Sequence, residues 1–325
     1  MLLLYRVRDW ISAIKKLGKS FEYHISAQKE AQKMKSYAAA VFVVAMAAVG
    51  VTAAAQSGSK PKWNVRLNET RGPVRAADMT TPLGKEAVSE ILAGPTNGSD
   101  QGYLIFTRMP SGAHGPSLFT LPDEHLYLVL EGKMNIQIGT DKFIVNKYEG
   151  VQIPPNTPHE VWNADAEPEV HLEVIPPGSS RDLLSMVKPA QPHKVENAAQ
   201  YVRTPKVPSQ ADLKPGLNGT AYASRQTGAT IQMRIDSTLP GQGGPKTHVH
   251  KFQQVYFSID GQTTVEYGLN LYPLPKYSIA VIQPGAVHTN YNKTSAMERH
   301  VTLLMPQLTD GSPADVEYER KGPTQ

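Results

Sequence analysis

The sequence has no cysteine and few aromatic side chains. None of its 325 residues is cysteine, which excludes disulfide bonds, zinc–thiolate sites, iron–sulfur clusters and thiol nucleophiles. A metal could therefore be held only by histidine, carboxylate or amide groups. Aromatic residues make up 7% of the chain, whereas there are 26 prolines and 25 glycines. This composition favours many short strands joined by turns over a helical bundle.

Most of the chain also has no excess of basic over acidic residues. The formal net charge is +4, but eight of the 33 lysine and arginine residues and only three of the 29 acidic residues lie in residues 1–55. The remainder therefore has one more acidic residue than basic residues. It offers no general basic surface for a phosphate backbone, so we expect no nucleic-acid partner.

Long hydrophobic runs are confined to one segment near the N-terminus. Residues 38–55 carry no charge, follow a short basic stretch and end in three alanines. This order predicts a secretory signal peptide over 34–55, cleaved after Ala55, with residues 1–33 as a leader or a mispredicted extension. A membrane anchor is the alternative, because 18 uncharged residues reach the lower edge of a spanning length. We expect a periplasmic or secreted protein with no stable membrane span after cleavage.

The rest of the chain contains an internal repeat at a constant offset of 129 residues. Gly132 aligns with Gly261 and His159 with His288, without any gap. Short β-prone runs separated by turn residues recur in both copies, which is typical of a sandwich or a barrel. The expected divisions are an N-terminal arm (56–90), a first barrel (91–178), a linker with short helices (179–215), a second barrel (216–310) and a C-terminal tail (311–325).

Three histidines in the second copy are spaced for a metal site. His248, His250, Gln254 and Tyr256 lie an even number of residues apart, so on strands their side chains share one face. His288 follows later, on a second expected strand. If these faces meet inside a barrel, three imidazoles and one amide converge. Neutral imidazoles suit Fe, Mn, Ni, Cu or Zn and leave positions open for water or substrate.

The same residues carry a resemblance to a known family. The run His248-x-His250-x3-Gln254 and the later Pro-Gly-x2-His288 resemble the two signature motifs of the cupin superfamily, in which two His, a Glu and a later His bind a metal inside a jelly-roll barrel. The resemblance implies an all-β bicupin with two tandem jelly-roll barrels. It implies one divalent transition metal per chain, with Fe favoured over Mn, Ni, Cu or Zn. Gln254 stands where the family has Glu, and a neutral amide should hold the metal more loosely.

The first copy lacks most of these ligands. By the repeat, Phe119 and Leu121 stand in place of the first two histidines, and only His125 and His159 remain. Two imidazoles are too few for a tight site unless a residue such as His114 or Glu124 joins them. We expect a structural barrel. The alternative is an apolar pocket for an organic ligand, lined by Phe119, Leu121, Tyr127 and Val129.

The resemblance implies a metal-dependent enzyme acting on a small organic molecule, of which a quercetinase-like or diketone-cleaving dioxygenase is the leading case. Tyr256 is the candidate catalytic group, because its hydroxyl could donate a hydrogen bond to substrate. Tyr127 holds the same place in the first copy, which favours a packing role instead. The alternatives are a Lewis-acid isomerase or lyase and a non-catalytic protein that binds a sugar or aromatic ligand. Self-association into a homo-oligomer stays open.

Overall fold

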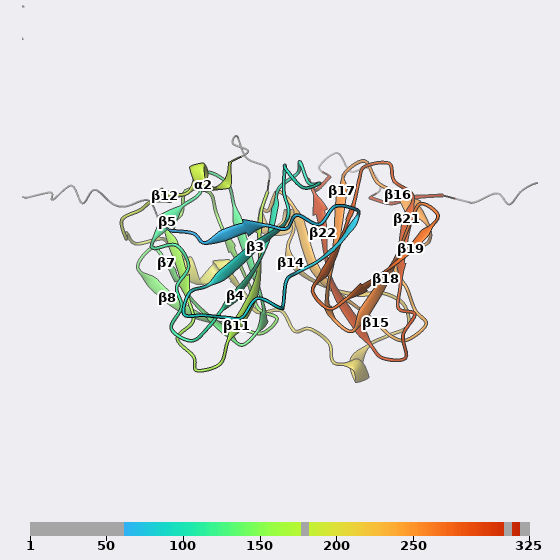
Figure 1. Cartoon of the computed structure of the whole chain (residues 1–325), viewed down its shortest axis with the longest axis horizontal. Coiled ribbons are helices and arrows are strands. Elements are labelled where there is room, and N and C mark those ends of the chain that lie inside the picture. Colours follow the sequence, from blue (N-terminus) through green and yellow to red (C-terminus); the bar gives the residue numbers. More distant parts are fainter. Residues whose placement is uncertain (1–61, 177–181, 309–313, 319–325) are drawn as a thin grey trace, which may run out of the picture. The chain divides into compact units, whose positions relative to one another are not determined.

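Two barrels of β-strands make up the part of the chain that the structure describes (Figure 1). The structure is a computed structural model and describes residues 62–176, 182–308 and 314–318, so the expected leader and signal peptide lie outside it. The described helices are short: α2 (Leu183–Met186) and the 3-10 helices η1 (Ala198–Tyr201), η2 (Gln210–Asp212) and η3 (Arg225–Thr227). Among the described residues no helix has the length and apolar character needed to cross a membrane. The expected all-β fold with short linker helices is confirmed.

The first barrel consists of a seven-stranded and a five-stranded sheet. In spatial order the larger sheet contains β1 (Val65–Leu67), β3 (Val88–Ala93), β4 (Tyr103–Met109), β11 (Glu169–Ile175), β6 (His125–Glu131), β9 (Gly150–Ile153) and β13 (Val202–Arg203). The smaller sheet contains β12 (Lys188–Pro189), β5 (Phe119–Thr120), β10 (His159–Trp162), β7 (Lys133–Ile138) and β8 (Asp141–Asn146).

The second barrel repeats this arrangement with a six-stranded and a five-stranded sheet. The larger sheet contains β14 (Asn218–Ala223), β15 (Gln232–Thr238), β22 (Glu298–Met305), β17 (Gln253–Asp260), β20 (Ser278–Ile282) and β2 (Val74–Ala76). The smaller sheet contains β19 (Asn270–Pro275), β18 (Gln262–Tyr267), β21 (His288–Tyr291), β16 (His248–Val249) and β23 (Val316–Glu317). The 129-residue offset holds strand by strand, since β10 starts at His159 and β21 at His288. The repeat in the sequence is thus a repeat in structure.

Local sequence explains the strand boundaries. Along β7 exposed or half-buried residues alternate with the buried Met134, Ile136 and Ile138, as expected for a strand with one face on a core. Gly132 and Gly261 end equivalent strands with φ of 69° and 67°. A Cβ at these positions would lie 2.7 and 2.8 Å from the carbonyl oxygens of the facing loops. Both the backbone conformation and the close approach therefore require glycine there.

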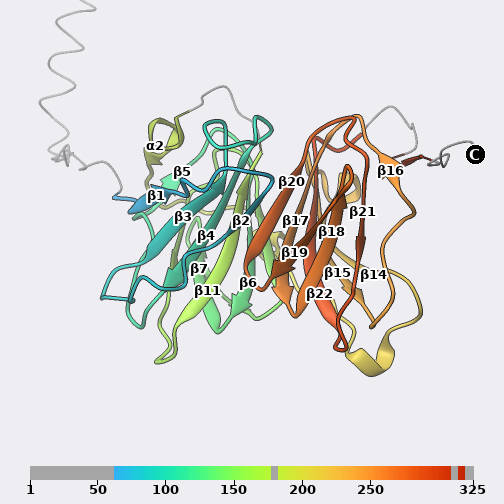
Figure 2. The same cartoon turned by 45° about the vertical axis from the view of Figure 1, so that its right-hand side comes forward.

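The two barrels pack against each other through their larger sheets (Figures 1 and 2). One continuous apolar core contains residues of both barrels, including Phe106, whose ring centroid lies 4.9 Å from that of Tyr277. The polar contacts are reciprocal: Tyr148 donates a hydrogen bond to Asp260, and Lys276, the neighbour of Tyr277, pairs with Glu131. Glu131 and Asp260 are equivalent by the repeat, so each barrel presents an acid at the same position to the other barrel, as an approximate two-fold axis requires.

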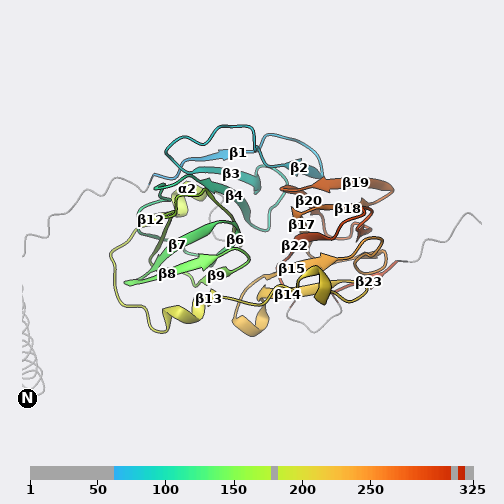
Figure 3. The same cartoon turned by 90° about the horizontal axis from the view of Figure 1, so that it is seen from below.

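The N-terminal arm connects the barrels a second time (Figure 3). Its strand β1 pairs in parallel with β3 of the first barrel, whereas β2 pairs antiparallel with β20 of the second barrel. In the first barrel the position equivalent to β2 is filled by β13, which comes from the linker and pairs with β9. Each barrel therefore completes its larger sheet with a segment from outside the repeated unit.

Candidate metal centre

The structure brings three histidines of the second barrel together. His248 on β16 and His288 on β21 are directly paired across two antiparallel strands, and His250 follows β16. One ring nitrogen from each of the three imidazoles lies within 4.8 Å of the other two. All three side chains are at most 5% exposed. Among the described residues, this is the only group of three or more His, Asp or Glu side chains with ligand atoms so close together.

Backbone carbonyls fix the tautomer of each imidazole. The Nδ1 atoms of His248, His250 and His288 lie 2.6, 2.7 and 2.9 Å from the carbonyl oxygens of Lys246, Ala314 and Ala286. A carbonyl oxygen can only accept, so each Nδ1 carries the proton and each Nε2 keeps its lone pair. Hydrogen bonds of this kind orient histidines that bind metals in proteins.

The unprotonated Nε2 atoms of the three histidines and the amide oxygen of Gln254 lie close together. The Nε2 atoms of His248 and His250 are 3.2 Å apart, and Oε1 of Gln254 contacts Nε2 of both His250 and His288. Burial lowers the pKa of His248, and burial together with the two neighbouring imidazoles lowers the pKa of His288 to about 3. His248 and His288 therefore stay neutral at physiological pH. Four lone pairs facing one centre repel each other unless a cation lies between them, so this donor set fits a metal ion.

A small cavity of about 110 Å³ is lined by two of the three histidines, His248 and His250. Tyr256 forms part of its wall, with its ring centroid 6.2 Å from that of His288, and its hydroxyl interacts with the side chain of Gln254. Burial raises the pKa of Tyr256, so the hydroxyl keeps its proton and can act as a donor. The other polar side chains of the cavity include Gln232, Arg234, Asp236, Asn290 and Asp315.

Asp315 and Ala314 are site residues that sequence reasoning missed. They belong to the segment expected to be a C-terminal tail, yet β23 of this segment pairs with β16 beside His248. Oδ1 of Asp315 lies 3.5 Å from Nδ1 of His250 and 4.0 Å from Nε2 of His248. The signal that could have found them is the repeat itself, because β12 and β23 lie 128 residues apart, within one residue of the repeat offset.

The equivalent region of the first barrel has no such centre. Phe119 is fully buried with its ring centroid 4.3 Å from that of His159, in the place that an imidazole occupies in the second barrel. His125 and His159 are adjacent, 3.1 Å from Nδ1 to Nε2, but among the described residues they belong to no group of three His, Asp or Glu side chains placed to hold a metal. His114 stacks on Trp162 and Glu124 accepts hydrogen bonds from Thr230. Leu121, Tyr127 and Val129 are buried with Phe119 among the core residues.

A buried ion-paired cluster lies beside His125 in the first barrel, and its His171 and Glu169 have equivalents in His300 and Glu298 of the second barrel. The carboxylate of Glu173 lies 3.1 Å from Nε2 of His125 and 3.3 Å from Nε2 of His171, whose Nδ1 is 2.9 Å from Glu169. Burial alone would lower the pKa of His171, but the two carboxylates outweigh it and raise the pKa to about 10. His171 is therefore charged and paired at neutral pH, as a structural residue of the core.

Comparisons with known proteins agree with this description. The Cupin_2 family, described as a cupin domain, matches residues 105–175, which form most of the first barrel. No curated protein matches the chain. Among solved structures, the oxalate decarboxylase of Bacillus subtilis, which has Mn(II) centres, is similar at 12% identity and a TM-score of 0.54, over 77% of this chain and 80% of that chain. A salicylate 1,2-dioxygenase from Pseudaminobacter salicylatoxidans is similar at 11% identity and a TM-score of 0.49, over 64% and 71%. Residues 105–175 thus match a cupin domain, and the second barrel repeats the strand arrangement of this matched barrel.

Proposed function

We propose that the protein is a metal-dependent enzyme acting on a small organic molecule in the second barrel. His248, His250 and His288 would hold one divalent transition metal, with Gln254 as a weaker oxygen donor. The observation that carries this proposal is the set of three Nδ1 hydrogen bonds to backbone carbonyls, because they aim three unprotonated Nε2 atoms at one point. Iron, manganese, nickel, copper and zinc all accept such ligands, and we favour iron.

The residues around the histidines supply the remaining chemistry. The metal, when bound, would act as a Lewis acid that polarises a substrate oxygen or binds dioxygen. The protonated hydroxyl of Tyr256 can donate a hydrogen bond to an oxygen of the substrate. The side chain of Asp315 is 40% exposed and lines the cavity, so its carboxylate can accept a hydrogen bond from a bound substrate or from water.

The cavity favours a small polar substrate. Its volume of about 110 Å³ is below the roughly 300–1,000 Å³ usual for drug-sized ligands, so a three-ring flavonol would not fit entirely inside. Gln232, Arg234 and Asn290 line it, whereas the equivalent side chains of the first barrel are Tyr103, Ile105 and Val161. A small oxygenated molecule such as a diketone therefore suits this cavity better than a flavonol, so within the proposed dioxygenase chemistry we favour the diketone-cleaving over the quercetinase type.

An isomerase or lyase is the second candidate. Tyr256 and Asp315 line the same cavity, where the tyrosine hydroxyl can donate and the carboxylate can accept a hydrogen bond. The two candidates differ in their use of oxygen. A dioxygenase consumes one O2 for each substrate molecule converted, whereas an isomerase or lyase consumes none. An oxygen electrode combined with mass spectrometry of products from a small diketone and from hydroxy acids distinguishes them.

The proposal is tested by measuring bound metal and turnover in protein purified without a His tag. We expect about one transition metal per chain, lost in His250→Ala and retained in His114→Ala, whose exposed ring stacks on Trp162 away from the site. Absence of metal in the wild-type protein would contradict the proposal. Metal without turnover of any tested substrate would favour a non-catalytic binding protein.

Export of the protein is a further part of the proposal. It rests on the apolar run and the three alanines before Gln56. Expression of the full chain in a bacterium, followed by separation of periplasm from cytosol, should give a periplasmic product that starts at Gln56. A full-length cytosolic product would contradict export.

A further inference from the structure

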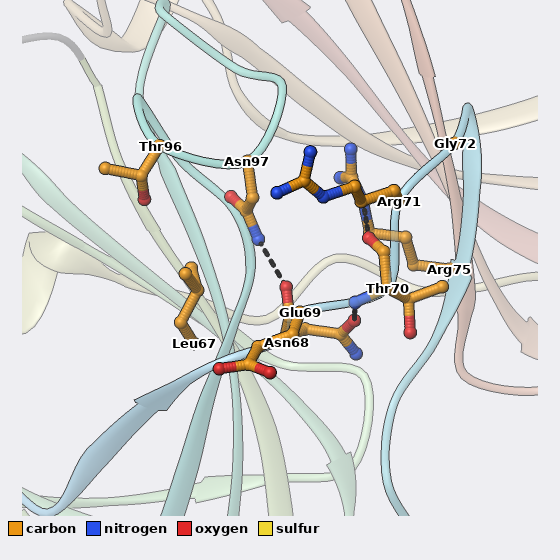
Figure 4. A pocket seen from close by; sticks show the side chains of 9 residues that line it. All are labelled: Leu67, Asn68, Glu69, Thr70, Arg71, Gly72, Arg75, Thr96 and Asn97. Carbon is orange, nitrogen blue, oxygen red and sulfur yellow. Dashed lines mark hydrogen bonds between the residues drawn. The ribbon is translucent and has the colours of Figure 1, made fainter.

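A second cavity is lined by residues of the N-terminal arm and contains none of the metal-site residues (Figure 4). It lies where the arm passes from the first barrel to the second. It has a volume of about 550 Å³, within the range of small-molecule sites. Its walls are the loop between β1 and β2 and the loop between β3 and β4. The polar side chains that line it are those of Asn68, Glu69, Thr70, Arg71, Arg75 and Asn97, with Thr96 at the edge.

Arg75 is a buried cation with no carboxylate partner. Its side chain belongs to a residue only 6% exposed, on strand β2. Nε donates to the carbonyl oxygen of Thr70 at 3.1 Å and Nη1 to that of Leu92 at 2.9 Å, which fixes the plane of the guanidinium. Within the described residues no Asp or Glu forms an ion pair with it. Burial lowers the pKa of Arg75, which means that its environment does not stabilise the charge.

A second arginine adds to the positive charge of this cavity. Arg71 is exposed and forms no ion pair with any described residue. Glu69 also lines the cavity but is not paired with either arginine among the residues described. The lining thus carries two cations and one anion. Nη2 of Arg75 makes no hydrogen bond to a described residue, so the two guanidinium groups offer several unused N–H donors.

The two-fold-related cavity of the first barrel provides a matched comparison. Arg203 on β13 is opposite Gly150 of β9, and Arg75 on β2 is opposite Ile279 of the equivalent strand β20. The cavity at Arg203 has about 410 Å³ and also contains the carboxylate of Glu124. Arg203 donates to the amide oxygen of Gln152. The lining of the cavity at Arg203 thus contains one cation and one anion. In the second barrel the residue equivalent to Glu124 is the neutral Gln253.

We propose that the cavity at Arg71 and Arg75 binds a small organic anion through a carboxylate or phosphate group. Guanidinium groups pair with both kinds of oxyanion through two parallel hydrogen bonds, and the backbone contacts of Arg75 hold its fork in place before binding. The ligand supplies the negative charge that the protein does not place beside Arg75. The site is separate from the histidines of the proposed metal centre, so it does not depend on the function proposed there.

Calorimetric titration of the purified protein with sodium phosphate and with sodium malonate tests the proposal. Sodium chloride serves as the control anion, at one ionic strength throughout. We expect saturable binding of one phosphate or malonate per chain. Arg75→Met and Arg71→Met should each weaken it by about tenfold or more, as expected for loss of a charge-assisted contact. Arg203→Met, the two-fold-related substitution, should change the affinity by less than about twofold.

Each outcome of this titration decides the proposal. Binding of phosphate alone assigns the site to phosphorylated molecules, binding of malonate alone assigns it to carboxylates, and both results support it. Absence of saturable binding in the wild-type protein would overturn it, and so would equal losses in Arg75→Met and Arg203→Met. If Arg75→Met does not fold, as circular dichroism would show, Arg71→Met decides, because Arg71 is exposed and makes no hydrogen bond to a described residue.

Discussion

The two barrels carry different chemistry on equivalent backbones. At the paired positions of the smaller sheets, the first barrel has Phe119 opposite His159 and the second has His248 opposite His288. The register is the same, yet one pair packs an aromatic ring on an imidazole and the other aims two imidazoles at a common centre. This difference shows that the barrel backbone sets where the side chains lie, whereas the identity of a few side chains decides whether a metal can bind there.

A second difference shows how each barrel neutralises its buried histidine. In the first barrel Thr107 donates to Glu173 at 2.6 Å, and in the second Thr302 donates to Asp236 at 2.5 Å. The threonine and the carboxylate have exchanged strands, because Thr107 is equivalent to Asp236 and Glu173 to Thr302. Each barrel keeps one acid–threonine pair beside its histidine, but only in the first does the acid reach two imidazoles.

Removal of the acid from this first pair should have the largest effect on stability. Glu173→Gln removes one of the two carboxylates beside the protonated His171, and its single amide oxygen cannot replace both carboxylate oxygens that face His125, His171 and Thr107. We expect the free energy of unfolding to fall by about 3–5 kcal/mol, as for other buried pairs broken on one side. Asp236→Asn should cost less, because the side chain of its partner Arg234 is 27% exposed and can reach water. Urea denaturation measures both, and equal losses would contradict this comparison.

Restoring the missing ligands should convert the first barrel. The double variant Phe119→His and Leu121→His would add two imidazoles to His125 and His159. The strand pairing of residue 119 with His159 is the same as that of His248 with His288 in the second barrel. We expect the metal content to rise from about one to about two per chain. Elemental analysis of the folded variant measures it. An unchanged count would mean that the cluster around Glu173 holds His125 away from a metal.

The pH dependence of stability should report on the buried charged histidines, because carboxylates raise the pKa of His171 in the first barrel and of its equivalent His300 in the second. The pKa of His171 is raised to about 10, from about 6.5 in the unfolded chain, so its contribution is complete below pH 6.5 and is lost as the pH rises to about 10. The steepest slope for one proton is about 1.4 kcal/mol per pH unit. Denaturation at pH 7 to 10 should show this alkaline loss in the wild-type protein. Its persistence in His171→Gln would assign the loss to another group.

A smaller change should sharpen the role of Gln254. Its amide oxygen contacts two of the three imidazoles, so Gln254→Glu would place a negative charge beside the metal. We expect about tenfold tighter metal binding, because one added charge in a partly buried site is worth about 1.4 kcal/mol or more. Competition with a chelator measures the affinity. Unchanged binding would show that Gln254 is not a ligand.

Sequence reasoning succeeded where a repeat or a strand alternation was present. The 129-residue offset recurs between the strands of the two barrels, and the expected β-strands near His248 and His288 are present as β16 and β21. His250 lies between β16 and β17, so strand alternation alone does not explain its place beside His248. Sequence reasoning did not find Asp315, because a two-residue strand such as β23 has no periodicity of its own. It also did not find the pairing of β2 with the second barrel, since a contact between segments so far apart leaves no local pattern. Arg75 went unnoticed for the same reason.

The most direct test of the central claim compares two equivalent histidines. His288→Gln and His159→Gln remove the same group from the same strand position of the two barrels, and both imidazoles are fully buried. Metal content after dialysis against a limiting concentration of Fe(II), measured by elemental analysis, should fall from about one per chain to near zero in His288→Gln. It should stay near one in folded His159→Gln. Equal metal content in the two variants would contradict the assignment of the metal to the second barrel.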